Sequence, residues 1–179
     1  MKYRLSLMLA VMVLLAAPLF AAAGERANFA AFLDAGAPIK VEEGEYADFG
    51  RFFAGLALQA RLGGNFYAEF SFAFYPAARP VNEFTNHDHG LEVALGGLWK
   101  IAPRKKLTPF ATLGLSYAEI NPRFYGPDRF WGLNTGGGIE CQLDRELLFR
   151  LGGAFTLAPI FFESVRAWGK IFAGLGLRF

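Results

Sequence analysis

The chain has 179 residues, of which 54% are hydrophobic and 16% aromatic, and it contains one cysteine, Cys141. A single cysteine excludes an intrachain disulfide, and the length suits one domain. The formal net charge of +2 comes from Lys2 and Arg4, because the rest of the chain carries 16 basic and 16 acidic residues. This balance gives no electrostatic reason to expect nucleic acid as a partner.

The first residues are typical of a secretory signal peptide. Two basic residues near the start precede residues 5–20, which are apolar apart from Ser6, and the alanines at 21–23 supply a small-residue cleavage site. We therefore expect residues 1–23 to be removed as a signal peptide and residues 24–179 to form one exported domain. The alternative is an uncleaved membrane anchor.

The rest of the chain alternates between apolar residues and small or polar ones. No later apolar stretch approaches the ~20 residues of a membrane helix, whereas a period of two predicts strands whose two faces meet different surroundings. Each alternating segment has at least the roughly 9–11 residues that a tilted transmembrane strand needs. We place these segments near residues 26–36, 50–61, 65–75, 89–101, 107–120, 129–142, 147–158 and 166–179.

One row of each segment is apolar and the other is polar or small. In the fourth segment Leu91, Val93 and Leu95 share one row, and Glu92 and Gly96 share the other. Apolar-out and polar-in is the pattern of a transmembrane barrel, and closure satisfies every backbone hydrogen bond in lipid. The predicted fold is all-β, an eight-stranded antiparallel up-and-down transmembrane β-barrel. A soluble barrel is the alternative, but the glycine-rich inner rows predict no apolar core for it.

The connections between the segments alternate in length. Residues 62–64, 102–106 and 144–146 form short links, whereas 37–49 and 76–88 form long ones. Transmembrane barrels have short periplasmic turns and longer external loops. Both termini are therefore expected in the periplasm.

The last segment ends with an apolar row at Ala173, Leu175, Leu177 and Phe179. It resembles the C-terminal signal that the barrel assembly machinery reads in bacterial outer-membrane proteins, except at Phe172, where that pattern usually has a polar residue. The whole mature chain resembles the small eight-stranded outer-membrane barrel family, which includes the OmpA membrane domain, OmpX and opacity proteins. The resemblance implies a monomer in the outer membrane of a Gram-negative bacterium, surrounded by lipid and lipopolysaccharide.

Charged residues on the inner rows are the main candidates for function. An eight-stranded barrel has an interior that side chains fill, so charges there must be paired. They either plug the lumen or line a narrow porin-like path for ions or small solutes. A three-residue hairpin loop at 144–146 would set Glu140 opposite Arg150 and predicts a hydrogen bond between their charges. The candidates are Asp34, Glu69, Glu92, Glu140, Arg150, Lys170 and Arg178.

Only one cluster, residues 86–89, has metal-ligand residue types, because His87 and His89 flank Asp88. A His-x-His pair can hold a metal, but no third ligand is specified, so we predict an ordinary loop and no metal or cofactor.

A less favoured alternative is a lipid A-modifying enzyme, which would need a histidine beside a serine. The mature serines are Ser71, Ser116 and Ser164, and neither histidine is followed two positions later by serine. We therefore predict no catalytic residue. The predicted role is structural or adhesion-like, with the external loops contacting a surface ligand.

Overall fold

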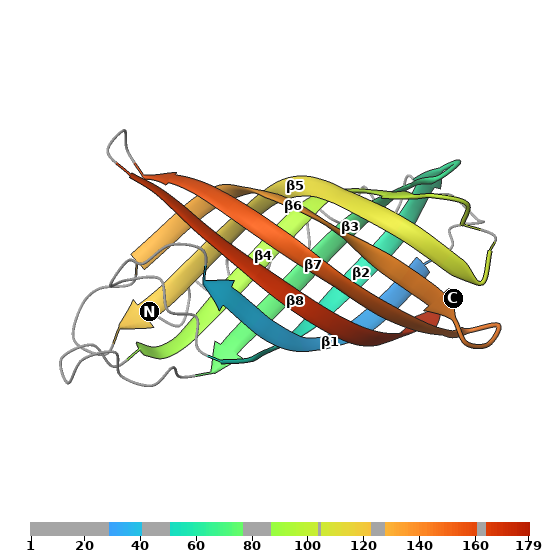
Figure 1. Ribbon diagram of the computed structural model, residues 1–179, viewed down its shortest axis with the longest axis horizontal. Coiled ribbons are helices and arrows are strands. Elements are labelled where there is room, and N and C mark those ends of the chain that lie inside the picture. The colour runs from blue at the N-terminus through green and yellow to red at the C-terminus, as the bar shows by residue number, and fades with distance from the viewer. Residues whose placement is uncertain (1–28, 41–50, 77–86, 104, 123–127, 161–163) are drawn as a thin grey trace.

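The computed structural model is a closed barrel in which each strand pairs antiparallel with the next and the eighth pairs with the first (Figure 1). The eight predicted strands are therefore confirmed. Their bounds are β1 Phe29–Lys40, β2 Phe53–Gly63, β3 Phe66–Pro76, β4 His87–Lys100, β5 Leu107–Pro122, β6 Asp128–Gln142, β7 Leu147–Ile160 and β8 Ser164–Arg178.

The structure describes residues 29–40, 51–76, 87–103, 105–122, 128–160 and 164–179. Among these residues, no helix has the length and apolar character to cross a membrane. The turns between β2 and β3, β4 and β5, and β6 and β7 lie at one end of the barrel, which we call the short-turn end. We call the opposite end, where β1 ends and β2 begins, the loop end.

Strand β1 is longer than the sequence predicted at its second end. Residues 37–40, expected in a loop, continue the strand and pair with β8, up to Lys40 opposite Trp168. On the other side, the pairing with β2 stops at Gly36. Pro38 therefore lies where one edge of the strand has no ladder partner, a position at which a missing N–H is tolerated.

Of two short turns predicted from the sequence, one lies where it was expected and the other is shifted. The three-residue hairpin at 144–146 is confirmed, because Gln142 pairs with Leu148 and the Leu143 N–H donates to the Leu147 carbonyl at 2.9 Å. The first short turn lies at residues 64–65 instead of 62–64 and follows a β-bulge. Gly64 there has φ 54°, a conformation that glycine adopts at little cost.

The outward-facing residues form an apolar surface around the barrel. Leu113, Leu115 and Leu133 are 65%, 60% and 58% exposed. Aromatic rings lie near both ends, with Phe66 opposite Trp99 toward the short turns and Trp131 beyond the leucines toward the loop end. Such a surface, with aromatic rings at two depths, is what a barrel presents to a bilayer.

Aromatic side chains also fill the loop half of the lumen. The expectation that the inner rows contain no apolar core is wrong in this half. Because Phe52 and Phe53 are adjacent, the sequence did not show which of them points inward, and the structure buries Phe53. This interior cluster comprises Phe53, Ala73, Tyr75, Ala118, Phe130, Ala158 and Trp168.

Candidate functional site: the charged lumen

Among the described residues, eight inward-facing charged side chains form ion pairs in the lumen, four acidic and four basic. All seven residues predicted from the sequence take part. The eighth is Lys100, which the sequence analysis missed although its even position places it on the same face as Glu92 and Gly96. The pairs fall into three clusters, which we call central, short-turn and loop-side.

The central cluster is built around Arg150 of β7, whose side chain is 2% exposed. Its Nε donates to Asp34 Oδ1 of β1 at 2.8 Å, and a second N–H donates to Asp34 Oδ2. A third bond, also 2.8 Å, reaches Glu69 Oε2 of β3. The rigid fork of the guanidinium suits such bidentate binding, so Arg150 ties together three strands.

Two aromatic rings pack against the Arg150 guanidinium. Its carbon lies 4.4 Å from the ring centre of Phe32 and 5.0 Å from that of Phe172. Cation–π contacts of this kind strengthen when water is excluded. Phe172, which departs from the usual polar residue of the terminal-strand signal, is therefore part of the central cluster.

Gly174 of β8 makes the central cluster sterically possible. It is the ladder partner of both Arg150 and Asp34, and so lies between them in one row. A Cβ at this position would overlap Asp34 Oδ1. The glycine in the last strand thus leaves room for the carboxylate that binds Arg150.

The predicted pairing of Glu140 with Arg150 is right in register and wrong in bonding. The two residues are direct ladder partners and both are 2% exposed. However, Glu140 accepts from Lys100 Nζ at 2.7 Å and lies 3.6 Å from an Arg178 nitrogen. The two carboxylates of the central cluster already occupy the Arg150 fork. Glu140 therefore belongs to the short-turn cluster, with Lys100 and Arg178.

The loop-side cluster joins Lys170 of β8 to Glu92 of β4 at 2.8 Å. The Tyr75 hydroxyl donates to the same Glu92 oxygen at 2.5 Å, and the Lys170 ammonium lies 5.7 Å from the ring centre of Phe53. The aromatic interior cluster surrounds this pair. Its charges are consequently buried among apolar side chains.

These clusters leave little space in the middle of the lumen. A cavity of about 30 Å³ lies beside Asp34 and Arg150, and another of about 20 Å³ lies beside Glu69 and Asn134. A buried water needs a cavity volume of about 10–15 Å³, so each of these cavities has room for one or two waters. Among the described residues, these side chains fill most of the middle of the lumen.

The other residues considered from the sequence do not assemble into a site in the described part of the chain. The His89 ring stacks on Phe74 with centroids 6.3 Å apart, whereas Ser71 and Ser116 lie on inward-facing rows. The side chains of His87, Asp88 and Ser164 lie outside the described residues. Among the described residues, no three His, Cys, Asp or Glu side chains form a metal-binding group.

Comparisons with known proteins identify the fold. No protein-family model matches the chain, and no curated protein sequence matches it. Solved structures do match. Neisserial surface protein A superposes with a TM-score of 0.63 at 12% identity, covering 86% of this chain and 97% of its own.

Two further structures extend this likeness. The N-terminal β-barrel domain of Pseudomonas aeruginosa OprF gives a TM-score of 0.59 at 16% identity, covering 86% of this chain and 96% of its own. The attachment invasion locus protein Ail of Yersinia pestis gives 0.57 at 16% identity, covering 86% and 98%. The chain therefore has the fold of the small eight-stranded outer-membrane barrels.

Proposed function

We propose that this chain is an integral protein of a bacterial outer membrane, in which a plugged barrel serves as a rigid scaffold for surface interaction. The apolar outer surface and the likeness to outer-membrane barrels support the location. The loop end would then face outward and both termini the periplasm, as in barrels with short periplasmic turns.

The filled lumen is the observation that carries this proposal. Arg150, Asp34 and Glu69 join β7, β1 and β3 across the interior, and the cavities beside them hold little more than single waters. A narrow channel, the alternative function, would require this cluster to separate. Its carboxylates would then be left unpaired in the interior, at high cost.

The segments at the loop end are the natural place for recognition on such a scaffold. Two of the matched structures carry names that refer to a surface protein and to attachment and invasion. In this chain the segment 41–50 contains Glu42, Glu43, Glu45 and Asp48. We infer that this acidic segment contributes to binding a partner on another surface, and that the protein acts without catalysis as a monomer.

Expression in a Gram-negative host tests the location and the interaction together. The protein is expected in the outer-membrane fraction, and intact cells carrying it should bind a component of a panel of extracellular-matrix and serum proteins. Neutralising the four acids of segment 41–50 to Gln or Asn should abolish that binding. Neutralising Asp144 and Glu146, exposed in a turn at the opposite end, provides the matched control and should leave it intact.

Recovery of the protein outside the outer membrane would contradict the proposed location. The interaction would be contradicted if cells carrying the protein bound the panel proteins no better than cells lacking it. Binding that survives neutralisation of the acids in segment 41–50 would also contradict it.

A further inference from the structure

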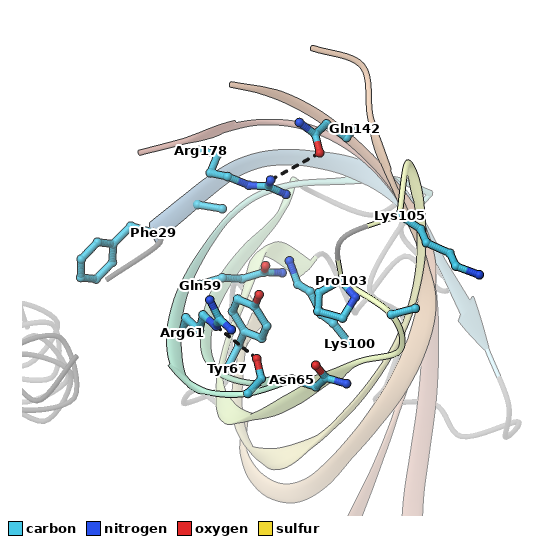
Figure 2. A pocket seen from close by; sticks show the side chains of 13 residues that line it. Phe29, Gln59, Arg61, Asn65, Tyr67, Lys100, Pro103, Lys105, Gln142 and Arg178 are labelled. Atoms are coloured by element: carbon cyan, nitrogen blue, oxygen red, sulfur yellow. Dashed lines mark hydrogen bonds between the residues drawn. The ribbon is translucent and has the colours of Figure 1, made fainter. Parts of the chain in front are cut away.

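The lumen opens at the short-turn end into a cavity of about 760 Å³ (Figure 2). This volume lies within the roughly 300–1,000 Å³ range of small-molecule sites. Gln59, which donates to Glu69 of the central cluster at 2.8 Å, lines the cavity and places the plug directly behind it. We call this blind cavity the basic vestibule.

The charge around the basic vestibule is strongly one-sided. None of the thirteen described residues that line it is acidic, and four are basic. Figure 2 shows the Lys105 ammonium directed away from the cavity, which leaves Arg61, Lys100 and Arg178 around it. Behind them Glu140 is shared by Lys100 and Arg178. These three cations outnumber the Glu140 carboxylate and the Glu69 carboxylate that binds Gln59, and an excess of positive charge in a cleft with protein walls attracts anions.

The two arginines of the basic vestibule are held loosely. Arg61 donates its Nε to the Gly64 carbonyl at 3.1 Å. The Arg178 side chain is 30% exposed, and its contacts with described residues are long, 3.5 Å to Gln142 and 3.6 Å to Glu140. A guanidinium has five N–H donors in a fork that fits phosphate and carboxylate. Both side chains can therefore bind an oxyanion without breaking a short ion pair.

A hydrogen-bond acceptor lies at the floor of the same cavity. Gln59 is 1% exposed and neighbouring atoms cover its Oε1, so a ligand would reach this oxygen only after a small side-chain shift. The oxygen has no hydrogen-bond partner among the described residues, although the amide nitrogen donates to Glu69. Buried polar atoms are normally paired. An acceptor beneath a ring of cations fits a ligand that has a hydroxyl as well as a negative group.

We propose that the basic vestibule binds a small organic oxyanion, a phosphorylated or carboxylated polyol such as a sugar phosphate or sugar acid. Arg61 and Arg178 bind the phosphate or carboxylate, and Gln59 Oε1 accepts from a hydroxyl. The site lies at the short-turn end of the barrel, opposite the loop end where β1 stops and β2 begins. It is therefore independent of the proposed surface interaction.

Calorimetric titration of the folded full-length barrel tests this site, in a polyoxyethylene detergent that carries neither charge nor sugar. The probes are glucose 6-phosphate, glucuronate, inorganic phosphate and glucose. Glucose 6-phosphate and glucuronate should bind saturably and more weakly as salt is raised. Inorganic phosphate should bind less tightly, and glucose should not bind.

Arg61→Gln and Arg178→Gln should each weaken glucose 6-phosphate binding about tenfold, the effect of losing one charge-assisted hydrogen bond. Lys106→Gln removes an exposed cation from the neighbouring turn, outside the cavity lining, and should change nothing. Arg61 lies at the rim, so its variant is expected to fold even where Arg178→Gln does not. Folding is checked by the heat-dependent shift in gel mobility.

Absence of saturable glucose 6-phosphate binding would overturn the proposal. Affinity unchanged in a folded Arg61→Gln barrel, or reduced equally in Lys106→Gln, would also overturn it. Equal affinities for inorganic phosphate and glucose 6-phosphate would overturn the role of Gln59.

Discussion

The two faces of the barrel wall are specified in different ways, although the same strands supply both. On the outer face, Leu113, Leu115 and Leu133 are all more than half exposed, and lipid requires of them only that they be apolar. On the inner face, Arg150 and Glu140 each have particular partners on other strands. The outer face therefore constrains the kind of residue, and the inner face constrains its identity.

The largest expected effect follows from breaking the central cluster. Arg150→Met would leave the mostly buried Asp34 and Glu69 without their cation, and should lower the free energy of unfolding by about 3–5 kcal/mol. Urea titration of the barrel in lipid vesicles measures this change. Arg145→Met, at an exposed turn position, is the control and should cost little. A loss below about 1 kcal/mol for Arg150→Met would show that the charges are hydrated.

A charge on the outer face should cost somewhat less. Leu95 pairs in register with Phe70 and Leu115 on the outward row, so Leu95→Arg should cost roughly 2–4 kcal/mol near the bilayer midplane. Leu95→Ile, which keeps the side chain apolar, should be close to neutral.

Cysteine labelling tests the same facing directly, once Cys141 has been replaced by serine. A lipid-soluble probe should label Leu95→Cys and leave Ala94→Cys unlabelled. The opposite result would invert β4.

Adding one methyl group should destabilise the barrel more on the inner face than on the outer face. Gly174→Ala would place a Cβ against the Asp34 carboxylate and should cost about 1–3 kcal/mol through overpacking. Gly97→Ala is the matched control, because a Cβ there meets no atom within 4 Å. Equal costs for the two substitutions would indicate a general strand effect of glycine replacement.

The smallest expected effect is a weak coupling between two ladder partners that are not hydrogen-bonded to each other. A double-mutant cycle on Asp34 and Arg150 should give an interaction energy of about 1–3 kcal/mol, because they are in contact. The same cycle on Glu140 and Arg150 should give a smaller value, because each is hydrogen-bonded to other partners and only the attraction between the two charges couples them. Comparable values would show that the register neighbours interact as strongly as the bonded pair.

The alternation of residues was enough to predict the strands and their faces. It did not predict contacts that form only when the barrel closes. A period of two is enough to locate the strands, their faces and the charges of the inner rows. The hairpin at 144–146 sets Glu140 opposite Arg150, because the number of residues in the loop fixes which residues of the two strands pair. The bond from Glu140 to Lys100 joins strands far apart in sequence, and its formation depends on how the closed barrel brings their inner faces together.

The alternation of residues along the chain did not reveal two further features. Adjacent aromatic residues at 52–53 give no alternation to follow, so the inward position of Phe53 and the aromatic interior cluster were not predicted. The extension of β1 to Lys40 depends on its pairing with β8, at the opposite end of the chain. Local sequence patterns contain neither signal.

Current recording across a planar lipid bilayer tests most directly whether the clusters seal the lumen. The wild-type barrel, inserted from detergent at neutral pH, should produce no stepwise conductance, because the central cluster blocks the lumen and the cavities beside it hold only one or two waters. Stable, reproducible single-channel openings of the wild-type protein would contradict the sealed lumen, and would favour a narrow channel for ions or small solutes.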